Sequence, residues 1–164
     1  MASDIESRNR RQNVVFVEDF IEVPCPIETV REHFVGDGQW LEAMANAAEE
    51  DGETARLRIG PTWGGRAITR EVHVRQVGKR QRGDALVVSL AWEPTTHSRL
   101  LPVLEGDLEL APIGEGLCRM TFSATYVPPF GEVGHALDRA LLHHVGQSTL
   151  RSFLQRLAKT FDES

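Results

Sequence analysis

The residues best suited to chemistry in this chain are two charged side chains placed where apolar ones are expected. Arg70 lies between Ile68 and Val72 on the apolar side of a predicted strand, and a charge in such a place must be paired or reach water. Asp19 interrupts the apolar side of the first predicted strand in the same way. Either the two residues form a structural pair, or they anchor the carboxylate, enolate or carbonyl group of a ligand in an apolar cavity.

A histidine on the long predicted C-terminal helix is the next candidate. At about 100° per residue, His144 falls on the same side of that helix as Leu137 and Leu141. If this side lines a cavity, a neutral imidazole there could donate to a ligand or act as a general base. The alternative is a histidine that is satisfied by a backbone carbonyl or that lies at the cavity rim.

Aromatic residues form the third group of candidates. Tyr126, the only tyrosine, ends the apolar side of the last predicted strand, which Phe122 shares, and Trp92 lies on the apolar side of another strand. Trp63 precedes two glycines and could belong to a mobile flap or pack under a loop. Aromatic side chains commonly shape an apolar pocket and orient a ligand through one polar atom. The alternative for each is plain core packing.

Composition and motifs exclude several classes of function. The formal net charge of −6 disfavours nucleic-acid binding, because that binding depends on neutralising phosphates. The six histidines form no HExxH or other ligand cluster, so no metal is expected, and we expect no other cofactor. The sequence also contains no GxSxG, P-loop or GxGxxG motif.

Cysteine usage and hydropathy bear on location. Cys25 and Cys118 are far apart and fit no CxxC spacing, which indicates small buried hydrophobes in a reducing compartment. No stretch approaches the roughly 20 apolar residues of a membrane span. Residues 1–12 are polar and contain no hydrophobic signal core. We therefore expect a cytoplasmic protein without integral membrane association.

The elements that position these residues follow from the apolar pattern. A length of 164 residues favours one domain, with residues 1–12 as a flexible lead-in and residues 13–164 as the domain. Two short helices are predicted at 27–35 and 39–47, and one long helix over 130–161. The intervening strands and turns indicate an antiparallel meander; strands are predicted at residues 13–23, 55–59, 67–77, 85–93, 103–111 and 117–127.

Side-chain alternation gives this predicted sheet one dry face and one wet face, and the long helix is the natural cover of the dry face. On the wet face, Glu105, Asp107 and Glu109 are expected to pair with arginines of neighbouring strands such as Arg119. The basic segment 78–83 is predicted to be a solvated hairpin tip.

The apolar stripe of the long helix changes sides around Gly146. The first half presents Leu137, Leu141 and His144, whereas the second half presents Leu150 and the apolar residues after it on nearly the opposite side. A straight helix on a flat sheet would keep a single stripe. We therefore predict that the first half lines a cavity, and that the second half is gripped by the first strand and the short helices.

Two segments carry a resemblance to a known family. The PPFGEVGHALDRALLHHVGQSTLRSFLQRLAKTF terminus and the LLPVLEGDLELAP strand, together with the order of elements, resemble the START-like (SRPBCC) superfamily and its bacterial polyketide cyclase/dehydrase-like branch. The resemblance implies an α+β helix-grip fold, in which a curved antiparallel sheet of six to seven strands wraps around a long C-terminal helix, with two short helices after the first strand. It also implies a cavity between sheet and helix that holds lipids, hormones or polyketides.

Three functions are compatible with this resemblance. The first is binding of a hydrophobic small molecule, lipid-like or polyketide-like, in the cavity. The second is an aromatase/cyclase-type enzyme in which Arg70, Tyr126 and His144 polarise carbonyls and move protons. The third is a protein-interaction module that regulates a partner. The partners expected are a hydrophobic ligand and, as an option, a second copy in a homodimer; nucleic acid is not expected.

Overall fold

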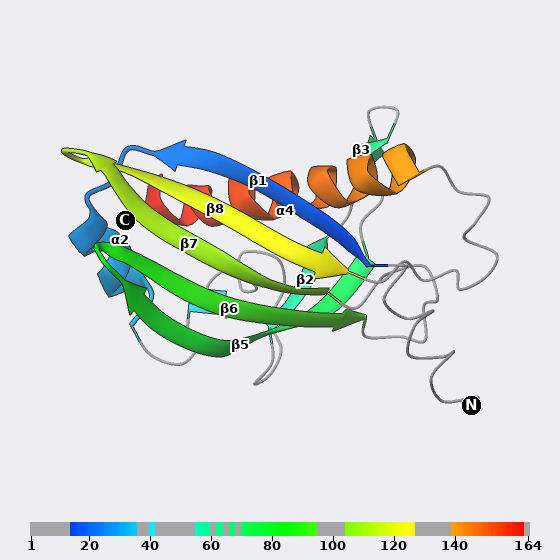
Figure 1. Cartoon of the computed structure of the whole chain (residues 1–164), viewed down its shortest axis with the longest axis horizontal. Helices are drawn as coiled ribbons and strands as arrows, with labels where there is room; N and C mark the ends of the chain where they lie inside the picture. Colours follow the sequence, from blue (N-terminus) through cyan, green and yellow to red (C-terminus); the bar gives the residue numbers. More distant parts are fainter. Residues whose placement is uncertain are drawn as a thin grey trace.

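The computed structural model describes residues 14–35, 40–41, 55–59, 62–63, 66–67, 70–94, 104–126 and 139–162. Figure 1 shows a curved sheet lying in front of one long helix. The elements in chain order are β1 (Val15–Val23), α2 (Ile27–His33), β2 (Ala55–Ile59), β3 (Thr62–Trp63), β4 (Arg66–Ala67), β5 (Arg70–Arg82), β6 (Ala85–Pro94), β7 (Leu104–Gly114), β8 (Leu117–Tyr126) and α4 (Arg139–Asp162).

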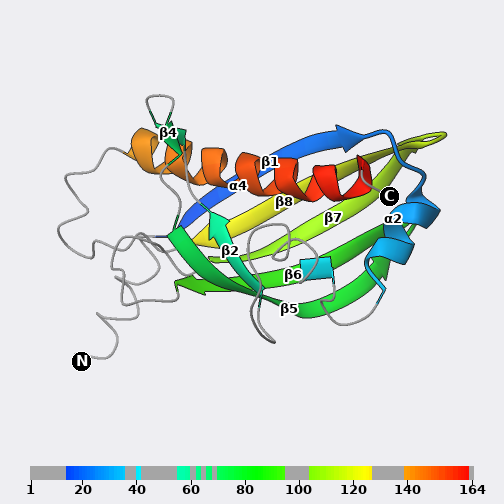
Figure 2. The ribbon, with the colours of Figure 1, turned by 180° about the vertical axis from the view of Figure 1, so that it is seen from behind.

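The main sheet has six antiparallel strands in the order β1-β8-β7-β6-β5-β2. Strands β5 to β8 form a meander, and β1 joins it beside β8. A separate two-stranded sheet consists of β3 and β4. Helix α4 packs on β1 and β8 across one face of the main sheet, as the view from behind shows (Figure 2). This arrangement confirms the predicted α+β helix-grip fold.

Alternation along the strands separates the two faces of the sheet as predicted. On β8 every second residue, from Cys118 to Tyr126, is buried, whereas Arg119 and the other residues between them are only partly buried or exposed. Successive side chains of a strand point to opposite faces, and the buried set belongs to the same core cluster as residues of α4. We call the face toward α4 the inner face and the opposite face the outer face.

The structure corrects the end of the strand predicted at residues 67–77. Segment 78–83 was expected to be a solvated turn, but β5 continues through it to Arg82, with a register shift between Gln76 and Gly78. The reason is a β-bulge, which absorbs one extra residue and lets pairing with β6 resume. Arg80 and Arg82 then extend from a strand and form ion pairs across the outer face.

The start of the same strand also differs from the prediction. Ala67 was expected to begin it, but Ala67 pairs with Thr62 in the small β3–β4 sheet, and β5 begins at Arg70. Among the other predicted elements, residues 55–59 match β2. Of the second short helix only Trp40 and Leu41 are described, and both are helical. The lead-in 1–12 and the first turns expected for the long helix lie outside the described residues.

The second half of α4 is gripped as predicted. Most of its apolar side chains are buried in the core, and Ala158 and Phe161 are partly buried against it. Fully burying such an apolar side chain contributes about 1.5–3 kcal/mol. At the far end, the ring of Phe161 lies 4.5 Å from that of His33 and 6.4 Å from that of Phe34, next to the end of α2. The buried residues on this half of α4 are Leu150, Phe153, Leu154 and Leu157. Neither described helix is long and apolar enough to cross a membrane.

Candidate ligand-binding site

A row of side chains crosses the inner face of the sheet and brings two predicted candidates together. Register places Tyr126 of β8 opposite Leu104 of β7, which in turn lies opposite Trp92 of β6, and Trp92 lies opposite Val74 of β5. All four are buried. We call this set the inner row. One strand separates Tyr126 from Trp92, so a single ligand could contact both rings.

Tyr126 provides the polar group of the inner row. It is 5% exposed, and burial raises the pKa of its phenol to about 12. The charged form is disfavoured because a phenolate would lose its hydration in this apolar setting. At neutral pH the phenol therefore keeps its proton, and such a group can both donate and accept a hydrogen bond.

Helix α4 touches the inner face directly beside Tyr126. The contact is at Gly146, where an added Cβ would lie 2.8 Å from Val17 Cγ1 and 2.9 Å from Tyr126 Cε1. The same Cβ would lie 3.3 Å from the phenol oxygen of Tyr126. These distances show that the helix backbone itself rests against β1 and β8 at this point.

An aromatic cluster fills the space under the next turns of α4. The ring of Phe153 lies 5.3 Å from that of Phe122 and 6.0 Å from that of Trp92, and the Trp92 and Phe122 rings are 5.8 Å apart. Gly106 leaves room for this cluster, since a Cβ there would lie 2.8 Å from Phe122 Cε2. Phe122 is fully buried and serves as core packing, while Trp92 belongs both to this cluster and to the inner row.

Asp19 has a partner that sequence reasoning missed. Its carboxylate accepts hydrogen bonds from Arg151 Nε and Nη2, both at 2.6 Å, and from the backbone N–H of Phe20 at 2.9 Å. Arg70 begins β5, which three strands separate from β1. Asp19 of β1 therefore pairs with Arg151 of α4 in place of the pairing with Arg70 that the sequence suggested. This is possible because α4 runs along β1. No sequence signal distinguishes Arg151 from other polar residues of the helix.

Among the residues that the structure describes, none of the remaining candidates is placed next to the inner row. Arg70 pairs through its backbone with Ile59 of β2, and Trp63 belongs to β3; their side chains lie outside the described set, as does that of Leu141 in α4. Leu137 lies outside the described residues altogether. The side chains of His143 and His144 are exposed. A ligand contact from any of these residues remains a prediction.

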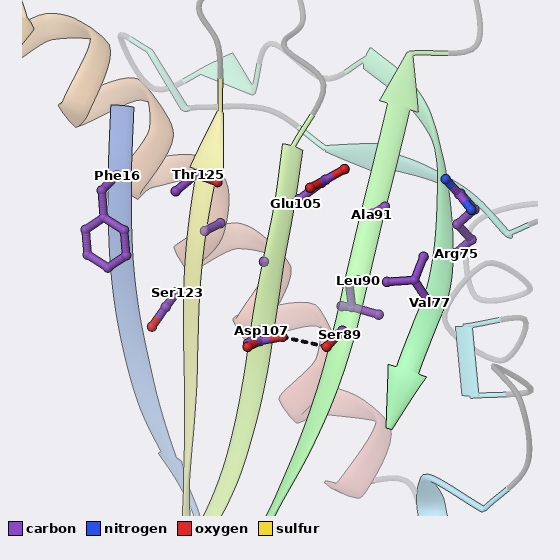
Figure 3. Close-up of a pocket in the computed structure, with 12 residues that line it drawn as sticks. Phe16, Arg75, Val77, Ser89, Leu90, Ala91, Glu105, Asp107, Ser123 and Thr125 are labelled. Carbon is purple, nitrogen blue, oxygen red and sulfur yellow. Dashed lines mark hydrogen bonds between the residues drawn. The ribbon is translucent and has the colours of Figure 1, made fainter. Parts of the chain in front are cut away.

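A depression of about 530 Å³ lies on the outer face, away from α4 (Figure 3). Its outward-pointing residues, such as Phe16 and Asp107, alternate along their strands with the buried residues Val17 and Leu108. Its lining mixes charged and hydroxyl side chains with apolar ones. The lining residues are Phe16, Arg75, Val77, Ser89, Leu90, Ala91, Glu105, Gly106, Asp107, Ser123, Ala124 and Thr125.

Ion pairs and hydrogen bonds organise this outer face. Asp107 accepts from Arg80 at 2.7 Å and from the Ser89 hydroxyl at 2.6 Å. The hydrogen bond from Arg80 is the main reason that the pKa of Asp107 lies below its ordinary value. Glu109 pairs with Arg82. Asp107 and Glu109 thus pair with arginines as expected, but these arginines lie on β5, which β6 separates from β7, and not on a neighbouring strand.

Arg119, which was named as an expected partner, bonds elsewhere on this face. It donates to Glu22 of β1 at 2.9 Å, and its guanidinium lies 4.9 Å from the ring centre of Phe20. Among the residues that the structure describes, no group of three or more histidine, cysteine, aspartate or glutamate side chains could hold a metal ion.

An antiparallel sheet that packs against a long C-terminal helix is the architecture of the START-like helix-grip class of proteins. Residues 15–162 match the family model described as polyketide cyclase/dehydrase and lipid transport, and the chain belongs to this family. A search of curated proteins finds no match by sequence.

Solved structures share the fold at low sequence identity. A conserved protein from Geobacillus kaustophilus is 18% identical with a TM-score of 0.57, over 92% of this chain and 97% of that one. Norcoclaurine synthase from Thalictrum flavum, in complex with dopamine and hydroxybenzaldehyde, is 12% identical with a TM-score of 0.51, over 92% of this chain and 87% of that one. At such identities the likeness concerns the fold alone.

Proposed function

We propose that the protein binds a hydrophobic small molecule, lipid-like or polyketide-like, between the inner face of the sheet and the first half of α4. The observation that supports this most is the inner row, in which apolar side chains from three strands continue to the Tyr126 phenol. Transfer of apolar ligand surface onto such a row contributes about 25 cal/mol per Å². The phenol adds one orienting hydrogen bond.

The family description and a structural neighbour support the same proposal. The family is described as polyketide cyclase/dehydrase and lipid transport, both of which concern mainly apolar molecules. Norcoclaurine synthase is described in complex with dopamine and hydroxybenzaldehyde, so a protein of this fold can hold small organic molecules.

Binding is favoured over catalysis by the placement of the candidate polar groups. An aromatase/cyclase mechanism would need Arg70, Tyr126 and His144 to converge on one ligand. Tyr126 is buried, whereas His144 is exposed on α4, so these two groups do not converge. The proposed function therefore assigns Tyr126 the role of a hydrogen-bonding group for a bound ligand.

Native mass spectrometry of gently purified protein tests the proposal, because a co-purified hydrophobic ligand would appear as an added mass. The environment-sensitive dye 8-anilino-1-naphthalenesulfonate provides a second measurement. Leu104→Trp places bulk in the inner row and should weaken dye binding about tenfold or more. Glu105→Trp is the matched control, since it adds the same side chain to the next residue on the outer face.

Folding of both variants is checked by circular dichroism, and Leu104→Phe replaces Leu104→Trp if the latter does not fold. The proposal predicts that Glu105→Trp binds the dye as the wild type does. Equal dye affinity in the wild type and in both folded variants, together with no added mass in the native spectrum, would contradict it.

A further inference from the structure

A glycine in the interior of a helix needs an explanation, and Gly146 has one. Glycine costs a helix about 1 kcal/mol relative to alanine, yet Gly146 lies well inside the 24-residue helix α4 and is buried. A Cβ at this position would come within 3.0 Å of both Val17 and Tyr126. The missing side chain is therefore what permits the close approach of α4 to the sheet.

The approach at Gly146 divides α4 in two. On the C-terminal side of Gly146, Leu150 and Phe153 are buried against the sheet, and the Phe153 ring is part of the closely packed aromatic cluster. On its N-terminal side, His143 and His144 are exposed. A ligand under the first half of the helix would thus meet Gly146 and the Tyr126 ring where the filled core begins.

We infer that Gly146 is a positioning residue: by holding α4 against β1 and β8, it fixes the Tyr126 phenol at the inner end of the ligand site and limits how far a ligand can extend along the helix. This inference rests on the proposed function for its statement about the ligand. Its statement about Tyr126 does not, because that follows from the contacts of Gly146 with Val17 and the tyrosine ring.

The single tyrosine of the chain makes the placement of Tyr126 directly measurable. Phenolate absorbs at longer ultraviolet wavelengths than phenol, so a spectrophotometric titration reports Tyr126 without interference from other tyrosines. In the wild type, burial raises the pKa of this phenol to about 12. In Gly146→Ala the new methyl group must displace the ring or the helix, and we expect the phenol to ionise at lower pH.

The same variant should bind 8-anilino-1-naphthalenesulfonate about tenfold more weakly than the wild type, as expected for overpacking. Gln147→Ala is the matched control, because it changes the adjacent, exposed residue of α4. It should leave both the phenol titration and the dye affinity unchanged. Far-UV circular dichroism at each titration pH checks that the helix is intact.

A second variant covers the case in which Gly146→Ala does not fold. Val17→Ala removes the methyl group nearest to the added Cβ, so Gly146→Ala in a Val17→Ala background should fold and move the phenol titration less than Gly146→Ala alone. A phenol titration and dye affinity equal to those of the matching background would overturn the inference. A shifted titration in a protein that binds no dye or native ligand would contradict the proposed function and leave the positioning role standing.

Discussion

Arg151 of α4 holds the buried carboxylate of Asp19 on β1 with two hydrogen bonds of 2.6 Å each. The two residues differ in exposure, since the side chain of Asp19 is 4% exposed and that of Arg151 is 52% exposed. The hydrogen bonds raise the pKa of Arg151 above its ordinary value. The pair links the edge strand of the sheet to the helix one turn after Gly146, and so supports the contact beside Tyr126.

Removing Arg151 should destabilise the protein by leaving Asp19 buried without its counter-charge. For Arg151→Gln we expect a loss of about 1–3 kcal/mol in the free energy of unfolding, below the range for fully buried pairs because Arg151 is half exposed. Urea denaturation measures it. Lys159→Gln, at an exposed residue of the same helix, is the control and should change stability by less than about 0.5 kcal/mol.

A double-mutant cycle with Asp19→Asn separates the pair from its surroundings. The Asn side chain removes the buried charge, so Arg151→Gln should cost less in the Asp19→Asn background than in the wild type. Equal losses in the two backgrounds would show that Arg151 contributes nothing through Asp19.

His33 should make the stability of the protein depend on pH. It packs among Phe34, Phe161 and Thr160, and burial lowers its pKa below the ordinary 6.5. The unfolded chain therefore binds this proton more readily than the folded protein does. The free energy of unfolding should fall as the pH drops from 6.5 through the lowered pKa.

Urea denaturation across this pH range measures the effect, and His33→Gln should reduce the slope. His144→Gln, which changes an exposed histidine of α4, should keep the wild-type slope. An unchanged slope in His33→Gln would show that another group carries the dependence.

Local pattern predicted much of the fold because period-two alternation and turn residues act over short distances. Residues 55–59 were predicted and match β2, and the buried positions of β8 follow its alternation. The extension of β5 past Gly78 was missed, since a bulge depends on how the strand pairs with β6. A glycine in the sequence is compatible with both a turn and a bulge, so the residue alone does not distinguish them.

The candidate site was predicted only in part for a similar reason. Tyr126 and Trp92 were selected by strand side, and the register of β7 between them brings them into one row. The partner of Asp19 lies 132 residues away, and its choice depends on the alignment of α4 along β1. The apolar stripe shifts around Gly146 in the sequence, but the contact of Gly146 with Tyr126 depends on how the helix packs on the sheet.

The outer-face pair of Arg80 and Asp107 should affect the pKa of Asp107 more than the overall stability of the protein. The hydrogen bond from Arg80 is the main cause of the lowered pKa of Asp107, so Arg80→Gln should raise that pKa toward its ordinary 3.8. Carbon-13 NMR of the carboxyl group measures it. Arg82→Gln is the control and should cause a smaller rise, because Arg82 acts only through its charge and is the weakest contributor.

The contribution of this pair to stability is present above about pH 3.8 and is lost as the pH falls through the lowered pKa of Asp107. Arg80 is exposed, so the melting temperature at neutral pH should be almost the same in Arg80→Gln and the wild type. An unchanged carboxyl titration in Arg80→Gln would contradict the assignment of the hydrogen bond as the main cause.

Two hairpin glycines should respond to substitution through backbone strain alone. Gly83 has φ 59° and Gly116 has φ 67°, and no heavy atom lies within 4 Å of a Cβ added at either. An L-residue in this left-handed region costs about 1–2 kcal/mol, and asparagine tolerates it better than alanine. Gly83→Ala and Gly116→Ala should therefore each lose about 1 kcal/mol in urea denaturation, and the corresponding asparagine variants should lose less.

Gly114→Ala is the control for these turns, because Gly114 has no positive φ and the nearest atom to an added Cβ is 3.9 Å away. It should be close to neutral. The order of stabilities, with alanine below asparagine at Gly83 and Gly116 but not at Gly114, distinguishes backbone strain from steric contact. Equal losses for alanine at all three positions would rule out strain as the cause, since only two of them have the left-handed backbone.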